Sequence, residues 1–190
     1  MKPIATDRSA TGIPTGRLAM WLLLPGEIVI FGGLLACYLV YRFHNPEWGV
    51  ESQHLNLVAG SINAVILLTS SLFILLAQHA AEKEQDYAAA FKWMWATVFC
   101  GIGYISVKAY EYTHEISEGF TITANVFWSF YYSATAIHAA HVFAGGLAIA
   151  ILSFSVKQGK HINRVELTGI YWHFVDLVWI FLFPLLYIAG

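Results

Sequence analysis

Five long apolar runs, separated by short polar segments, occupy almost the whole chain. They cover residues 18–41, 57–77, 91–110, 126–155 and 167–188. Each run is close to or above the ~20 residues with which a helix crosses a bilayer. Because the connections are short and no internal repeat is visible, the pattern predicts one domain over residues 1–190. We expect an all-α fold, an integral membrane bundle of five transmembrane helices.

The composition points to the same class of protein. Hydrophobic residues make up 58% of the chain, charged residues make up 12%, and the mean hydropathy is +0.60. These values do not suit a soluble domain of this length. The formal net charge is −2 and the basic residues form no dense patch, so we expect no nucleic-acid partner.

The distribution of basic residues predicts the orientation of the helices. If the chain crosses the membrane five times, most of the basic residues fall on one side of it, and Arg42 and Lys108 fall on the other. The positive-inside rule then places the N-terminus in the cytoplasm and the C-terminus outside. The residues on the cytoplasmic side are Lys2, Arg8, Arg17, Lys83, Lys92, Lys157, Lys160 and Arg164.

Ionisable residues inside the apolar runs are the candidates for function. Such a side chain at bilayer depth costs roughly 2.5–3.5 kcal/mol even on lenient scales, so it is rarely found without a partner or a role. Glu27 lies about nine residues into the first run, which corresponds to a depth of ~13 Å. We expect its carboxyl to be neutral or paired. Two interpretations stay open: a structural hydrogen bond between helices, or a role in handling protons or water.

Two histidines lie within the fourth run. His138 and His141 are three residues apart, and Ala134, Gly145 and Ala148 place small side chains on the same face. Small residues allow another helix to approach closely. This pattern predicts a tight helix contact at the histidines.

The fifth run carries two acids and a further histidine. Glu166 and His173 are seven residues apart and share a face, whereas His173 and Asp176 are one helical turn apart and are expected to satisfy each other. Two imidazoles and a carboxylate are also a recognised metal-ligand set. However, no Glu-x-x-His pair supplies the second carboxylate of a di-iron bundle, and interhelical hydrogen bonds would satisfy the same groups. We therefore predict no metal in this chain.

The segment after the third run is rich in acids. It contains Glu111, His114, Glu115 and Glu118, and we expect a solvated acidic face on the outer side of the membrane. Docking of a basic partner is the alternative for this segment.

Two motifs and a shorter segment carry a family likeness. Residues 171–183 read Tyr-Trp-His-Phe-Val-Asp-Leu-Val-Trp-Ile-Phe-Leu-Phe and are preceded by Glu166. Residues 131–145 read Tyr-Tyr-Ser-Ala-Thr-Ala-Ile-His-Ala-Ala-His-Val-Phe-Ala-Gly, and Glu27 stands in Pro-Gly-Glu-Ile-Val-Ile-Phe. Over most of its length the chain closely resembles cytochrome c oxidase subunit III, the third subunit of haem-copper terminal oxidases, in a short form with five helices.

The resemblance implies a non-catalytic subunit of a proton-pumping oxygen reductase in the aerobic respiratory chain. Such a subunit is a multi-pass protein of the bacterial cytoplasmic (inner) membrane. It has no redox centre of its own, since haem and copper belong to partner subunits I and II. It packs on subunit I, binds phospholipid, and supports the structure and proton uptake of the complex.

The resemblance also assigns residues by position. Lys157 is the nearest substitute for a basic residue that faces lipid headgroups in the family. The residues implied as the buried polar set, which supports structure and the proton environment, are Glu27, His138, His141, Glu166, His173 and Asp176.

Three alternatives to the favoured function stay open. In the first alternative, the chain is an accessory subunit of a quinol oxidase. In the second alternative, it is an accessory subunit of nitric oxide reductase. In the third, outside the family, it is an independent metal-binding or transport membrane protein. Genomic neighbours and metal analysis of the isolated chain separate these cases.

Overall fold

The computed structural model describes residues 15–45 and 47–188, and helices dominate this part of the chain. The long helices are α1 (Thr15–His44), α3 (Leu57–His79), α4 (Tyr87–Ser117), α5 (Val126–Val156) and α6 (Asn163–Phe183). Short helical segments accompany them: α2 (Trp48–Ser52), η2 (Ala80–Glu84) after α3, and η3 (Pro184–Ile188) after α6. Within the described residues, five helices are long and apolar enough to cross a membrane. This confirms the predicted all-α bundle with five long apolar helices.

Polar side chains start three of the long helices. Asn56 accepts a hydrogen bond from the backbone N–H of Ala59, and Asn125 accepts one from that of Trp128. Asp86 accepts from two backbone N–H groups at the start of α4. These groups would otherwise lack partners, because the first turn of a helix has no preceding carbonyls. The short polar segments between the apolar runs therefore fix where the helices begin.

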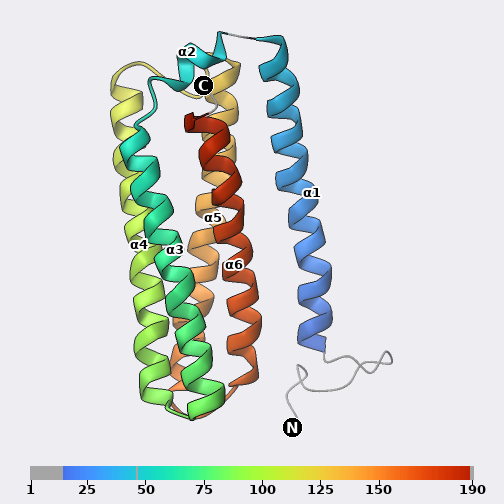
Figure 1. Ribbon diagram of the computed structural model, residues 1–190, viewed down its shortest axis with the longest axis vertical. Coiled ribbons are helices and arrows are strands. Elements are labelled where there is room, and N and C mark those ends of the chain that lie inside the picture. The colour runs from blue at the N-terminus through green and yellow to red at the C-terminus, as the bar shows by residue number, and fades with distance from the viewer. Residues whose placement is uncertain (1–14, 46, 189–190) are drawn as a thin grey trace.

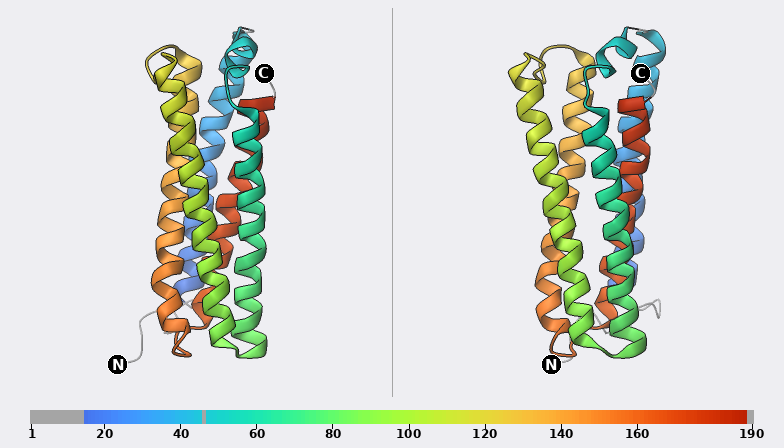
Figure 2. Two further views of the ribbon diagram at one scale, coloured as in Figure 1. Left: turned by 90° about the vertical axis from the view of Figure 1, so that its left-hand side faces the viewer. Right: turned by 60° about the vertical axis from the view of Figure 1, so that its left-hand side comes forward.

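Helices α3 to α6 form a group of four neighbours, and α1 stands beside this group (Figure 1). The four helices alternate in direction, so the end of η3 lies at the same end of the bundle as α2 (Figure 2). We call this the upper end, and the end at which α1 begins the lower end. Lys2 and Arg8, which contributed to the predicted orientation, lie outside the described residues.

Three polar contacts join α1 to the rest of the bundle at different heights. Arg17 forms an ion pair with Glu166 near the lower end. Glu27 contacts His141 further up. The Tyr38 hydroxyl donates to the backbone carbonyl of Leu185 at 3.0 Å near the upper end. The helix that stands apart is thus attached by side-chain hydrogen bonds along its whole length.

The contact between α5 and α6 is close at Gly145, as the small residues of this face predicted. A Cβ atom at this position would lie 3.0 Å from the ring of Tyr171 and 3.1 Å from that of Trp172. The indole N–H of Trp172 in turn donates to the Ser70 hydroxyl of α3 at 2.8 Å. Gly145 therefore leaves the space in which a buried tryptophan links α6 to α3.

Helix α4 continues beyond the predicted end at residue 110 and finishes at Ser117. With 31 residues it is about 46 Å long, more than the ~30 Å of a hydrocarbon core. Consequently Glu111 and Glu115 lie in the helix and not in a solvated loop. The boundary was misjudged because a hydropathy average falls at charged residues even when their side chains are buried.

Candidate functional site

Glu27 and His141 lie against each other where α1 passes α5. The distance from Glu27 Oε2 to His141 Nε2 is 3.0 Å, and the side chains are 19% and 20% exposed. The carboxyl was expected to be neutral or paired, and the structure gives it a partner. The sequence did not identify that partner, since the two residues are 114 positions apart.

The other ring nitrogen of His141 limits where the protons of this pair can lie. His141 Nδ1 is 2.7 Å from the backbone carbonyl oxygen of Ile137, which can only accept a hydrogen bond. Nδ1 therefore carries a proton and donates it. A single proton then remains between Nε2 and the Glu27 oxygen, on the acid of a neutral pair or on the imidazolium of an ion pair. The net charge of the pair is zero in both cases, which lowers the cost of placing it in a membrane.

His138 is completely buried among α4, α5 and α6. Its Nε2 donates to the carbonyl oxygen of Val175 at 3.0 Å, which fixes the tautomer. Nδ1 is then free to accept from the Tyr104 hydroxyl at 2.9 Å. His138 thus supplies the interhelical hydrogen bonds that the sequence predicted for this face, and both of its nitrogens are occupied.

The expected pairing of His173 with Asp176 is wrong. His173 Nδ1 lies 2.6 Å from the Ser71 hydroxyl of α3 instead. Asp176 is buried and lies near the same hydroxyl, but neither of its carboxyl oxygens has a partner with hydrogen-bond geometry among the described residues. A spacing of one helical turn allows two side chains to meet, but it does not require a contact. Here both side chains point toward Ser71 of α3 and not toward each other.

The spacing of Glu166 and His173 placed them on one face, but the partner of Glu166 is Arg17 of α1. Both of its carboxyl oxygens accept from Arg17 Nη2, at 3.1 Å and 2.8 Å. The Arg17 side chain is 55% exposed, so this ion pair lies at the surface of the lower end. The structure therefore separates Glu166 from the buried histidines.

The buried polar set does not form one metal centre. Within residues 15–45 and 47–188, no group of three or more His, Cys, Asp or Glu side chains converges in a way that could hold a metal ion. The nitrogens of His138 and His141 face protein partners. The set instead consists of separate interhelical contacts.

The sequence missed a second polar cluster, in the upper part of the bundle. Lys108 was placed among outer basic residues and Glu111 in a solvated acidic face, but their side chains are 3% and 1% exposed and form an ion pair at 2.9 Å. Glu115 is also buried. The prediction of a solvated face is wrong for these two acids, whereas His114 and Glu118 lie at the surface.

The spacing of the buried residues along α4 was the signal that could have revealed this cluster. Tyr104, Lys108, Glu111 and Glu115 recur every three or four residues, which is the period of one helix face. Charged residues were assigned to solvent by their type, although their positions continue the buried stripe.

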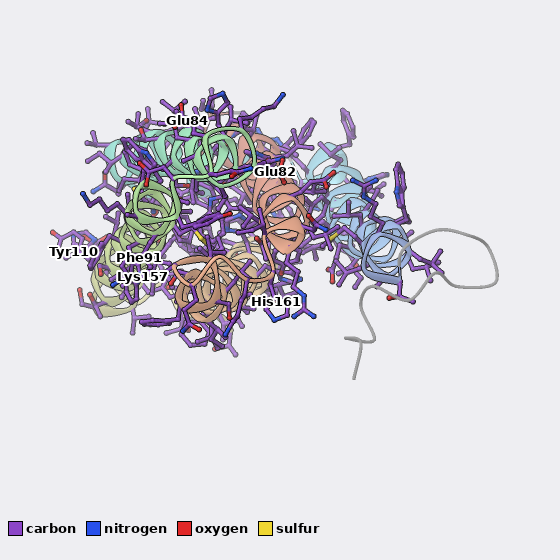
Figure 3. All side chains as sticks on the ribbon, turned by 90° about the horizontal axis from the view of Figure 1, so that it is seen from below. Glu82, Glu84, Phe91, Tyr110, Lys157 and His161 are labelled. Atoms are coloured by element: carbon purple, nitrogen blue, oxygen red, sulfur yellow. The ribbon has the colours of Figure 1, made fainter. Side chains whose placement is uncertain are left out.

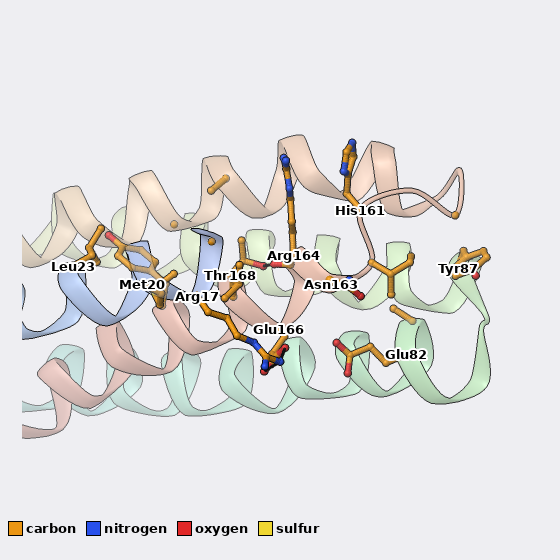
Figure 4. Close-up of a pocket in the computed structure, with 18 of the residues that line it drawn as sticks. Arg17, Met20, Leu23, Glu82, Tyr87, His161, Asn163, Arg164, Glu166 and Thr168 are labelled. Atoms are coloured by element: carbon orange, nitrogen blue, oxygen red, sulfur yellow. Dashed lines mark hydrogen bonds and ion pairs between the residues drawn. The ribbon is translucent and has the colours of Figure 1, made fainter. Parts of the chain in front are cut away.

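A pocket of about 1370 Å³ lies between α1 and the lower halves of α5 and α6 (Figure 4). Met20, Leu23 and Ala148 contribute apolar lining, and Arg164 and Glu166 contribute charges at the lower end. Figure 4 shows Arg17 and Glu166 pointing toward each other at this pocket.

Lys157, which the resemblance assigned to lipid contact, is not among the residues that line this pocket. Its Nζ atom lies 4.8 Å from the ring centroid of Phe91, over the contact between α5 and α4 (Figure 3). The Lys157 side chain is exposed, so it lies at the surface of the lower end.

Comparison with known proteins gives consistent matches along nearly the whole chain. Residues 17–190 match the family model described as Cytochrome c oxidase subunit III. The chain is 36% identical over 190 residues to cytochrome c oxidase subunit 3 of Thermostichus vulcanus, covering 97% of this chain and 92% of the relative. It is 32% identical over 178 residues to cytochrome c oxidase subunit 3 of Bacillus subtilis, covering 91% and 86%.

A third relative is a much longer protein. The chain is 30% identical over 185 residues to the heme-copper oxidase subunit I+III of Aeropyrum pernix. The match covers 91% of this chain and 22% of that protein.

Proposed function

Because the chain belongs to the cytochrome c oxidase subunit III family, we propose that it serves as the non-catalytic third subunit of a proton-pumping haem-copper oxygen reductase. The observation that carries this proposal is the match over residues 17–190, which includes all five long helices. Haem and copper, and therefore the oxygen chemistry, belong to the partner subunits. The role of this chain is to complete and stabilise the complex.

The proposed partner in the membrane is subunit I, with subunit II in the same complex. The name of the Aeropyrum relative joins subunits I and III in one polypeptide, and this chain matches 22% of it. Covalent fusion of two subunits is consistent with their lying side by side in an assembly. Apolar side chains cover the exposed face of α1, among them Leu22, Val29 and Phe43, and they suit either a partner helix or lipid.

We propose that the pocket between α1 and α6 holds a phospholipid. Its volume, its apolar lining and the charged groups at its lower end match a molecule with acyl chains and a polar headgroup. Arg164 and His161 line the pocket at that end and are suited to contact a phosphate. A lipid there would also fill the space between α1 and the four-helix group.

The proposed contribution to proton uptake rests on Glu27 and His141. The pair lies within two spans, holds one proton between its members, and is a fifth exposed. A group of this kind can pass a proton without changing the net charge of the membrane interior. A purely structural interhelical hydrogen bond is the alternative, and the proton-pumping stoichiometry of a Glu27 variant distinguishes the two.

We further propose that the protein lies in the bacterial cytoplasmic membrane with its lower end in the cytoplasm. Its bacterial relatives and the excess of basic residues at the lower end support this orientation. Lys108 is buried in an ion pair and does not face solvent. Among the described Lys and Arg residues, Arg42 is then the one that remains at the upper end outside such a pair. The described basic residues of the lower end are Arg17, Lys83, Lys92, Lys157, Lys160 and Arg164.

The test is purification of the tagged chain in mild detergent from its native membrane. Mass spectrometry of the co-purifying subunits, a reduced-minus-oxidised haem spectrum and oxygen consumption are then measured. We expect subunits I and II and activity with reduced cytochrome c. Activity with a quinol only would favour the quinol-oxidase alternative. Reduction of nitric oxide without oxygen consumption would favour an accessory subunit of nitric oxide reductase. A colourless chain without partners would refute the proposal.

A further inference from the structure

Lys108 carries an ammonium group in the interior of the upper part of the bundle, where only 2% of the residue is exposed. Nζ donates to Glu111 Oε2 at 2.9 Å, to the Tyr187 hydroxyl at 2.6 Å and to the Tyr131 hydroxyl at 3.3 Å. An ammonium has three protons to donate, so all of them are used. The partners come from α4, α5 and η3.

Aromatic rings enclose the same nitrogen. The distances from Nζ to the ring centroids are 5.6 Å for Tyr112, 4.9 Å for Tyr131, 5.1 Å for Trp179 and 5.2 Å for Tyr187. The distances to Tyr112 and Trp179 are within the ~6 Å at which a cation is attracted to an aromatic face. Nζ meets Tyr131 and Tyr187 at their hydroxyl oxygens. With Trp179 the enclosure also includes α6, so four helical elements meet at one nitrogen atom.

Aromatic faces combined with a carboxylate are the surroundings in which proteins bind organic ammonium ligands. We propose that Glu111, the hydroxyls of Tyr131 and Tyr187 and the rings of Tyr112 and Trp179 form an ammonium-binding site that the chain fills with its own Lys108 side chain. The filled site holds η3 against α4 and α5. The C-terminal segment η3 begins at Pro184, directly after α6, and its Tyr187 contacts both members of the ion pair. Tyr187 donates to Glu111 Oε1 and accepts from Lys108.

The charges nearby explain why the site needs an occupant. Glu111 and Glu115 are both buried, at 1% and 2% exposure, and Glu115 Oε2 has no hydrogen-bond partner among the described residues. Removing the ammonium leaves the Glu111 carboxylate unpaired beside a second buried acid, in a region with little access to water. A buried ion pair that loses one partner is strongly destabilised, because the remaining charge has no compensation.

The first experiment is chemical rescue of Lys108→Ala. The substitution removes the atoms from Cγ to Nζ, which propylammonium replaces, and propan-1-ol has nearly the same shape without the charge. We measure the Tm of the full-length chain in mild detergent with its co-purifying subunits. We expect a fall of about 10 °C, and a recovery that grows with the propylammonium concentration and is absent with propan-1-ol. Lys157→Ala, which removes an exposed ammonium near the ring of Phe91, is the matched control and is expected to show neither effect.

The second experiment does not depend on a variant with a cavity. Lys108→Met keeps the length of the side chain but leaves Glu111 unpaired, and the double variant Lys108→Met/Glu111→Gln removes both charges. We expect the double variant to have the higher Tm of the two. The proposal is overturned if Lys108→Ala has the Tm of the unsubstituted chain, if propan-1-ol rescues as well as propylammonium, or if the double variant is no more stable than Lys108→Met. If Lys108→Ala does not accumulate, the comparison of the two methionine variants decides alone.

Discussion

The carboxyl of Glu27 and the imidazole of His141 share a single proton across the contact between α1 and α5. The hydrogen bond from His141 Nδ1 to the Ile137 carbonyl leaves one proton for the 3.0 Å contact between Nε2 and Glu27 Oε2. A charge at this depth would be costly alone, and the pair avoids that cost by staying neutral overall. The same pair attaches the one long helix that stands outside the four-helix group.

Glu27→Gln is therefore expected to leave assembly intact. The amide N–H can donate to His141 Nε2 as the protonated acid does, so shape and hydrogen bond are kept. Subunit composition by gel electrophoresis of the purified complex measures assembly. The unsubstituted chain should also react at Glu27 with a hydrophobic carbodiimide, which requires a carboxyl, and Glu27→Gln should lose the labelling at this residue.

Glu27→Leu is the matched control, because it removes the hydrogen bond but keeps an apolar helix. It should lower the Tm by a few degrees, since His141 Nε2 loses its partner. Loss of assembly in Glu27→Gln would show that His141 is an imidazolium that needs a carboxylate, and that the neutral form of the pair is wrong.

The substitution Gly145→Ala is expected to destabilise the protein, whereas Gly146→Ala is expected to be tolerated. A Cβ at Gly145 meets the rings of Tyr171 and Trp172 at 3.0 Å and 3.1 Å, but a Cβ at Gly146 would be 4.0 Å from the ring of Trp172. Overpacking costs about 1–3 kcal/mol, which corresponds to a Tm lower by roughly 2–12 °C. Thermal unfolding of the two variants measures the difference. Equal Tm values would show that Trp172 can move away and that the close approach of α5 and α6 is not required.

Hydropathy predicted much of this fold, because five long apolar runs leave little choice but five membrane-spanning helices. The helix ends lie within a few residues of the predicted ones except at α4, whose buried face continues through Lys108, Glu111 and Glu115. A hydropathy scale gives each residue type a single preference for water or for an apolar environment, whatever its neighbours are. A buried ion pair contradicts that assumption, because each charge is stabilised by the other.

The candidate site was predictable as a set of residues but not as a set of contacts. Glu27, His138 and His141 stood out because ionisable groups are rare in spans. Their partners depend on how helices distant in sequence are rotated about their axes, and the sequence gives no direct measure of that rotation. His173 shows the difficulty, since its partner is Ser71 on another helix and not Asp176 on its own.

Tyr104→Phe and His138→Leu should destabilise the protein to different degrees. Tyr104→Phe removes one hydrogen bond, for an expected cost of about 1 kcal/mol. His138→Leu removes two hydrogen bonds and leaves the Tyr104 hydroxyl without a partner in a fully buried place, which alone costs about 1–3 kcal/mol. The Val175 carbonyl loses the bond from His138 but keeps its bond within α6. Tm values measured side by side should therefore fall in that order. A larger effect of Tyr104→Phe would contradict the assignment of His138 as the centre of the contact.

The proposed phospholipid gives a prediction for Arg164. Arg164→Ala should reduce the phospholipid that remains bound after mild-detergent purification, because a charged group that lines the lower end of the pocket is lost. Lipid extraction and mass spectrometry measure the amount per complex. Lys157→Ala is the comparison, since the family resemblance assigned lipid contact to Lys157 but the residue does not line the pocket. Loss of lipid in Lys157→Ala alone would favour that earlier assignment and a site between α4 and α5.

The isolated chain is expected to bind no stoichiometric iron, copper or zinc. His138 would have to give up the Val175 carbonyl or the Tyr104 hydroxyl to bind a metal, and His141 would have to give up Glu27. A ligand set would also need residues from several of these separate contacts to converge, which would disrupt the packing of α5 on α4 and α6. Elemental analysis of the purified chain, after separation from its partner subunits, measures the metal content. One metal ion per polypeptide, lost in His138→Leu but kept in a surface variant such as His114→Ala, would contradict the structural role of these histidines.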